Sequence, residues 1–201
     1  MKSALLLSGG MDSIALAWWK RPDVAITIDY GQRAAEAELS ASKAICNRLD
    51  IEHVELTMSS QELGSGDMAG KAVSRFGNKS DWWPYRNQFL VTVAGMRLIE
   101  FGVNNIMLAS VRTDESHVDG TQGFIERLNS VMSIQEGHVK ITAPAIRLST
   151  FELVKKSELP PELLAWAHSC HKANVPCGNC RGCNKYLEVY NQLDELAAYR
   201  V

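Results

Sequence analysis

The sequence predicts an α/β protein in which a parallel sheet is covered by helices on both faces, with a small cysteine-rich segment near the C-terminus. Three observations predict this architecture. Strand-like and helix-like segments alternate through the first 110 residues, which is the pattern of parallel α/β sheets. A glycine-containing turn joins the first strand to the first helix, and four cysteines lie close together between residues 170 and 183.

The expected strands are short apolar or β-branched runs, and the expected helices carry apolar residues at helical spacing. Arg21-Pro22-Asp23 ends the first helix, and Gly102 ends the third. The expected strands are 4–7, 24–29, 51–56, 106–111 and 140–143, and the expected helices are 13–20, 34–49, 88–101, 124–134 and 150–156. Two long loops, 59–83 and 113–123, remain between them. Ligands of such sheets bind at the carboxyl ends of the strands, so we seek the site in the loops that follow strands.

Length and net charge limit the classes of protein to which this chain can belong. The 201 residues fit one domain, 1–201, with a metal-binding segment at about 165–190. The net charge of -2 argues against direct binding to nucleic acid, which needs a basic excess. No apolar stretch approaches the roughly 20 residues of a membrane span, and the first apolar run is too short for a signal peptide. We therefore expect a cytoplasmic protein that does not contact a membrane.

The turn after the first strand reads Leu7-Ser8-Gly9-Gly10-Met11-Asp12-Ser13. Glycines let successive backbone amides surround an anion, and the following helix adds its unpaired N–H groups and the positive end of its dipole. The serine hydroxyls can donate to phosphate oxygens, and Asp12 can hold a magnesium ion. The alternative is a plain Gly-Gly turn in which Asp12 or Ser13 caps the helix. The complete motif at a strand-to-helix turn favours phosphate binding.

The four clustered cysteines, Cys170, Cys177, Cys180 and Cys183, predict a metal site. In a reducing compartment, such spacing indicates metal ligation before disulfides. Four thiolates suit a closed structural zinc site, and an iron–sulfur cluster accepts the same ligands. His168 and His171 flank Cys170, and we expect neither to bind the metal. Cys46 stands apart on a helical pattern and is expected to be a core residue.

The loop resembles the PP-loop of the adenine nucleotide alpha-hydrolase superfamily. Together with the cysteines, the chain resembles the 7-cyano-7-deazaguanine synthase family over almost its whole length. The matching segments are Asp29-Tyr30-Gly31-Gln32-Arg33, Arg86-Asn87, Asp119, Phe124-Ile125, Ala143-Pro144, Leu148-Ser149 and Ser169-Cys170. The resemblance implies a Rossmann-like fold, a homodimer, and the use of ATP, magnesium and structural zinc. It also implies adenylation of the carboxylate of 7-carboxy-7-deazaguanine and its conversion with ammonia to an amide and then a nitrile.

The resemblance assigns roles to individual residues. The catalytic residues are Asp12, Ser13 and Arg86, and the residues that bind the deazaguanine substrate are Arg86, Asn87, His117 and Asp119. The ATP-binding residues are Leu7, Ser8, Gly9, Gly10, Met11, Asp12, Ser13 and Asp29. Asp29 has a second interpretation as a turn residue at a strand end. Trp82 and Trp83 either stack on the purine-like ring or anchor their loop.

Three departures from the family pattern leave alternatives open. Val118-Asp119-Gly120-Thr121 stands where the family has Pro-Asp-Cys-Arg, Tyr85 replaces a glycine, and Thr150 replaces a lysine expected to contact phosphates. Arg147, Lys155 or Lys156 are candidates to replace that lysine. One alternative function is a synthase-like antiphage enzyme that couples the deazaguanine carboxylate to the N-terminal amine of an acceptor protein. Another is a nucleotide-binding module without catalysis.

Overall fold

The computed structural model describes residues 2–77, 79–114 and 117–198. Its centre is a five-stranded sheet of order β3-β2-β1-β4-β5, in which every neighbouring pair is parallel. The strands are β1 (Lys2–Leu6), β2 (Val24–Asp29), β3 (Glu52–Thr57), β4 (Val103–Met107) and β5 (Lys140–Thr142). The predicted parallel α/β class is confirmed. The fourth strand lies earlier in the chain than the expected 106–111, because Val103 already pairs with Lys2 of β1.

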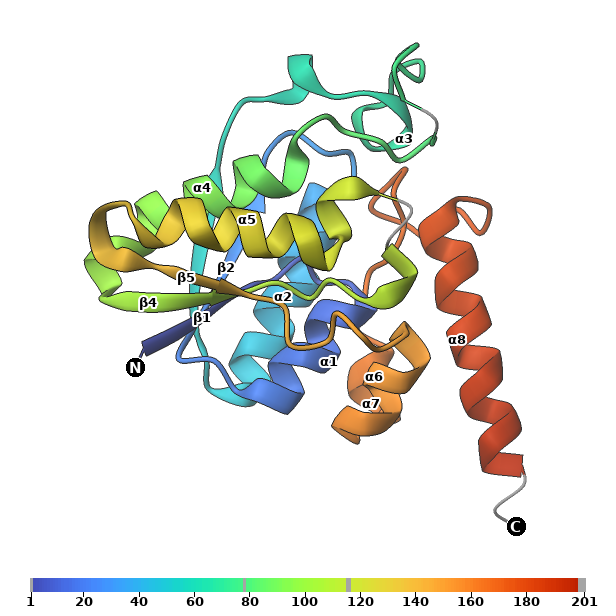
Figure 1. Cartoon of the computed structure of the whole chain (residues 1–201). Coiled ribbons are helices and arrows are strands. Elements are labelled where there is room, and N and C mark those ends of the chain that lie inside the picture. The colour runs from blue at the N-terminus through green and yellow to red at the C-terminus, as the bar shows by residue number, and fades with distance from the viewer. Residues whose placement is uncertain (1, 78, 115–116, 199–201) are drawn as a thin grey trace.

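Helices cover both faces of this sheet: α4 and α5 lie on one side, and α1, α2 and α6 on the other (Figure 1). The helices are α1 (Met11–Lys20), α2 (Ala35–Leu49), α3 (Gly66–Ala69), α4 (Arg86–Leu98), α5 (Gln122–Ser133), α6 (Thr150–Ser157), α7 (Pro161–Leu164) and α8 (Arg181–Ala198). The sequence patterns predicted α1, α2, α4, α5 and α6 but not α3, α7 or α8. Within the described ranges, no helix combines the length and apolar character that crossing a membrane requires.

The core has two halves, one on each face of the sheet, because successive strand residues point to opposite faces. In β1, Ala4 packs with the cluster under α4 and α5, whereas Leu5 packs with α1 and α6. In β2, Ile26 faces the first cluster and Ala25 the second. A strand that is buried on both faces needs apolar residues at every position, and this explains the continuous apolar runs in the sequence.

The strand order creates a crevice between β1 and β4. From β1, the chain moves outward in one direction to β2 and β3, and from β4 it moves in the other direction to β5. The loops after β1 and β4 therefore diverge, and such a reversal is where open α/β sheets bind ligands. Helix α8 stands at the side of the sheet, next to α6 (Figure 1). Its Val189 is buried with the cluster around α1 and α6.

Candidate functional site

A cavity of about 800 Å³ opens at the carboxyl ends of β1, β2 and β4. Its volume falls within the range of small-molecule and cofactor sites. Its wall combines the turn after β1, the loop after β4, residues 168–171 and one side of α8. The turn after β1, which we name the phosphate loop after the phosphate site that its sequence predicts, contributes Leu7, Ser8, Gly10, Met11, Asp12 and Ser13 to this lining.

The phosphate loop leaves the first turn of α1 open to a ligand. Gly10 is the N-cap residue, and no side chain caps the helix there. The Ser13 hydroxyl instead donates to the Gly10 carbonyl at 2.9 Å, and the Ser8 hydroxyl lies 3.3 Å from the Ser13 hydroxyl. The plain-turn alternative requires Asp12 or Ser13 to cap the helix, and neither side chain does so. Uncapped N–H groups at a helix terminus are a favourable anion site.

Gly9 lies where the loop packs closely against neighbouring segments. Its φ is +71°, and a Cβ atom there would lie 2.6 Å from the carbonyl oxygen of Glu38 in α2. Its own carbonyl accepts a hydrogen bond from the His168 backbone N–H at 2.9 Å. The prediction that Gly9 binds ATP concerns its backbone and stays a prediction. Gly9 lies outside the lining and lets the loop pack closely against α2 and the cysteine segment.

Asp29 also lies outside the lining of the cavity. Its carboxylate accepts a hydrogen bond from the Gly31 backbone N–H at 2.9 Å. The side chain thus closes the turn after β2, which is the second of the two interpretations drawn from the sequence. A contact between Asp29 and ATP stays a prediction.

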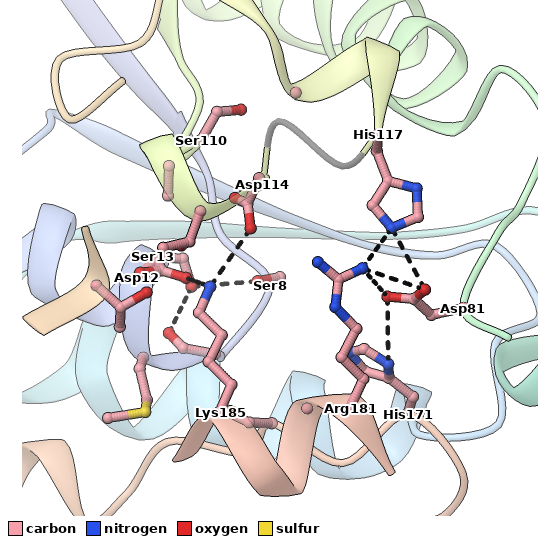
Figure 2. A pocket seen from close by; sticks show the side chains of 18 of the residues that line it. Ser8, Asp12, Ser13, Asp81, Ser110, Asp114, His117, His171, Arg181 and Lys185 are labelled. Atoms are coloured by element: carbon pink, nitrogen blue, oxygen red, sulfur yellow. Dashed lines mark hydrogen bonds and ion pairs between the residues drawn. The ribbon is translucent and has the colours of Figure 1, made fainter. Parts of the chain in front are cut away.

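Lys185 of α8 is the main site residue that the sequence patterns missed. Its Nζ atom lies 2.8 Å from Asp12 Oδ2 and 3.4 Å from Asp114 Oδ1 (Figure 2). Burial by itself lowers the pKa of Lys185, but the two carboxylates outweigh burial, so the pKa is raised and the ammonium stays charged. No motif marks this residue, because it lies on a helix that the patterns did not predict.

The cations proposed from the sequence lie elsewhere. Arg147 and Lys155 are exposed, and neither lines the cavity. Lys156 is exposed too, and its Nζ lies 5.0 Å from the centre of the Trp19 ring on the outside of α1. In this structure none of the three therefore lies where the missing lysine is expected to contact phosphates. Thr150 itself is buried at the start of α6 and lines the cavity.

The acidic groups around Lys185 fit a magnesium ion. Asp12 Oδ1 is buried and has no hydrogen-bond partner, and Asp114 Oδ1 lies 3.4 Å from the same Lys185 ammonium. Carboxylate oxygens are the ligands that magnesium prefers, and it usually binds through one or two of them together with substrate phosphates. The donor set thus agrees with magnesium brought to the site with a nucleotide.

A second polar cluster surrounds Asp81, whose side chain is only 8% exposed. Arg181 Nη1 lies 3.1 Å from its carboxylate, His117 Nε2 3.3 Å and His171 Nδ1 3.8 Å (Figure 2). Burial by itself raises the pKa of Asp81. The His117 hydrogen bond and the Arg181 charge outweigh burial, so the pKa lies well below its usual range. Asp81 thereby ties the long loop 59–83 to the loop after β4 and to the cysteine segment.

The predicted substrate residues all line the cavity: Arg86, Asn87, His117 and Asp119. Asp119 is joined to α4, because the Asn87 backbone N–H donates to Asp119 Oδ2 at 3.2 Å and the Asn87 side chain donates to the Asp119 carbonyl at 2.9 Å. Four predicted residues from two separate segments are therefore brought together at one end of the cavity.

Glu38 lines the same cavity, and the patterns did not indicate it. Burial raises the pKa of Glu38 to about 7, although Gln32 donates a hydrogen bond to its carboxylate at 2.7 Å.

Trp83 was a candidate for stacking on a ligand ring, but it is 5% exposed and packs edge-on against Tyr30, with ring centres 4.9 Å apart. Neither Trp82 nor Trp83 lines the cavity, so the structure favours the second interpretation, in which both side chains anchor their own loop.

The four predicted metal ligands come together. The sulfur atoms of Cys170, Cys177, Cys180 and Cys183 all lie within 4.8 Å of one another, and two pairs are 3.9 and 4.0 Å apart. Zinc–sulfur bonds of about 2.3 Å in a tetrahedron place sulfur atoms about 3.8 Å apart. The residues therefore fit a closed four-thiolate metal site. Cys46 is buried in α2, as predicted, and burial raises the pKa of its thiol to about 12.

The doubly wound parallel sheet, the uncapped turn after β1 and the cavity beside it define an α/β protein with a cavity at the carboxyl edge of its sheet. The model of the family described as queuosine biosynthesis protein QueC matches residues 2–194, so the chain belongs to this family.

Relatives agree with this membership. A 7-cyano-7-deazaguanine synthase of Methanosarcina mazei is 26% identical, over 96% of this chain and 95% of that protein. A 7-cyano-7-deazaguanine synthase of Methanosarcina barkeri is 30% identical, over 91% of this chain and 90% of that protein. Among solved structures, the U34-tRNA thiolase NcsA from Methanococcus maripaludis, with its [4Fe-4S] cluster, is similar with a TM-score of 0.51 and 16% identity. That match covers 99% of this chain and 66% of the thiolase chain, and it supports the fold alone.

Proposed function

We propose that this protein is an ATP-dependent synthase that converts 7-carboxy-7-deazaguanine to 7-cyano-7-deazaguanine with ammonia. The observation that carries the proposal is the position of the two halves of the site in one cavity. The uncapped phosphate loop lines one part of it, and Arg86, Asn87 and Asp119 line another. An activated acyl group that forms between the two halves of the site can be contacted by residues of both halves.

The proposed chemistry overcomes the low reactivity of a carboxylate. A carboxylate oxygen attacks the α-phosphorus of ATP, and pyrophosphate leaves. Ammonia then attacks the acyl carbon, AMP leaves and a proton is lost, which gives the amide. The amide oxygen then attacks the α-phosphorus of a second ATP and pyrophosphate leaves. AMP departs, and both N–H protons are lost, as the carbon–nitrogen triple bond forms. The use of two ATP per nitrile follows from this sequence of steps.

We infer the roles of the residues from their positions. The loop amides and the Ser8 and Ser13 hydroxyls hold the phosphates, and Asp12 with Asp114 holds magnesium, which supplies positive charge to the phosphates when bound. Arg86 binds the substrate carboxylate and stabilises the negative charge that develops there. Asn87, His117 and Asp119 bind the deazaguanine ring. Zinc bound by the four cysteines serves as a structural ion.

Mass spectrometry of the products tests the function. The purified protein is incubated with ATP, magnesium, 7-carboxy-7-deazaguanine and ammonium, and we expect the amide first, then the nitrile, with two AMP per nitrile. A parallel reaction replaces ammonium by a short peptide with a free N-terminal amine, which tests a protein acceptor directly. A peptide adduct without nitrile would replace ammonia as the acceptor. No AMP in either reaction would contradict catalysis altogether.

The substrate half of the cavity yields a separate prediction. Asp119→Asn is expected to weaken binding of 7-carboxy-7-deazaguanine roughly tenfold or more, because a buried polar pairing contributes about 1–3 kcal/mol. ATP binding should stay nearly unchanged, since Asp119 lies with Asn87 at the start of α4 and makes no hydrogen bond to the phosphate loop. Calorimetry with each ligand measures both affinities. Equal loss of both ligands, or loss of neither, would refute this assignment.

A further inference from the structure

We propose that Lys185 binds the phosphates of ATP, so that the C-terminal helix α8 supplies the cation of the phosphate site. The inference rests on the proposed use of ATP and adds a residue from a part of the chain that the phosphate-loop motif does not include. Lys185 and Asp12 are 173 positions apart in the sequence and 2.8 Å apart in the structure.

The first support is the position of the ammonium. Lys185 Nζ lies beside Asp12, the second residue of α1, at the terminus where the helix N–H groups are uncapped. Figure 2 shows the side chain extending from α8 toward Asp12, Ser13 and Asp114. The side chain is 31% exposed, so a ligand in the cavity can reach it. A phosphate bound to the loop amides would lie next to this cation.

The second support is the charge balance of the wall. Asp12 and Asp114 bring two negative charges to the loop, and Lys185 brings one positive charge. The other strong cations of the lining contact groups outside the loop, since Arg181 pairs with Asp81 and Arg86 contacts Met68, whereas Lys185 pairs with Asp12 of the loop itself. Among the described residues that line the cavity, Lys185 is the one lysine. A polyphosphate needs positive charge at this loop, and Lys185 is placed to provide it.

The third support is that one face of α8 lines the cavity. Lys185, Glu188, Val189 and Gln192 all line it, at the spacing of one helix face. The start of the helix is held in place, because Cys180 and Cys183 belong to the metal cluster and flank its first turn. A Cβ atom at Gly182 would lie 1.7 Å from the Ser169 carbonyl oxygen, which shows how closely the helix start packs on that segment. The position of Lys185 is therefore determined by the cysteine site.

Calorimetry with two ligands tests the inference. Lys185→Met keeps the length of the side chain and removes its charge, and Lys155→Met makes the same change at an exposed position of α6 outside the cavity. Each protein is titrated with ATP plus magnesium and with adenosine, which has no phosphates. We expect Lys185→Met to weaken ATP binding roughly 10- to 100-fold and leave adenosine binding unchanged. Lys185→Arg should restore part of the ATP affinity, and Lys155→Met should match the wild type.

Each contrary outcome is informative. Unchanged ATP affinity in Lys185→Met would overturn the inference. Equal loss of ATP and adenosine, together with a lower melting temperature or lower metal content, would overturn it in favour of a purely structural ion pair that holds α8. The synthase function is judged separately, by product formation in the wild type. If the wild type binds ATP but forms no nitrile or amide, the role of Lys185 stands and the proposed reaction falls.

Discussion

Replacing Cys183 by serine is expected to remove the metal, loosen the start of α8 and abolish ATP turnover. Folding around a four-thiolate zinc ion in small peptides contributes on the order of 10 kcal/mol, so the loss of one ligand should unravel the segment around it. The loss should extend to the phosphate site, because Lys185 lies two positions after Cys183 and the His168 N–H bonds to the Gly9 carbonyl.

Elemental analysis of the purified protein measures the metal, and limited proteolysis measures the loosening of the C-terminal segment. We expect one zinc per chain in the wild type and in Cys46→Ala, a cysteine that is buried in α2 away from the cluster. Cys183→Ser should lose the zinc and be cut near residues 170–185. Wild-type protein without metal, or with the colour of an iron–sulfur cluster, would contradict the zinc assignment. Full metal content in Cys183→Ser would contradict the ligand assignment.

Replacing Asp12 by asparagine is expected to lower ATP turnover roughly 100- to 1000-fold without unfolding the protein. Asparagine keeps the size of the side chain, but it removes the negative charge beside Lys185 and replaces one of the two carboxylate oxygens by an NH2 donor, which cannot bind a cation. The change therefore affects the electrostatics of the phosphate site and leaves the packing of α1 unaltered. Ser13→Ala is expected to act in the same direction, because the Ser13 hydroxyl orders the loop through the Gly10 carbonyl.

Release of AMP is the measurement for both variants, and the melting temperature is the check on folding. Asp194→Asn makes the same chemical change at an exposed position of α8 and should keep wild-type turnover. Near-normal AMP release by Asp12→Asn would mean that the turn after β1 is not the phosphate site. A large drop in melting temperature would mean that Asp12 acts through the fold.

The sequence by itself determined those features whose residues are close together in the chain. The alternation of strands and helices, the loop Ser8–Ser13 and the four cysteines within fourteen positions are local patterns, and each is visible without knowledge of distant contacts. Local geometry dictates these residue types: glycines where amides surround an anion, and closely spaced thiols where one metal binds them. The same locality explains why the boundaries of β2 and the start of α6 were predicted correctly.

Only the tertiary structure decided which side chains share the cavity. Asp12 meets Lys185 across 173 positions, and Asp81 meets Arg181 across 100, and no local pattern encodes such pairs. Side-chain direction was equally hidden: Asp29 turns to its own loop, and Trp83 turns into the core against Tyr30. Helix α8 was missed although its apolar residues pack with the cluster around α1 and α6 and its polar residues line the cavity. Long-range packing places these groups, and their chemistry becomes visible only once the chain is folded.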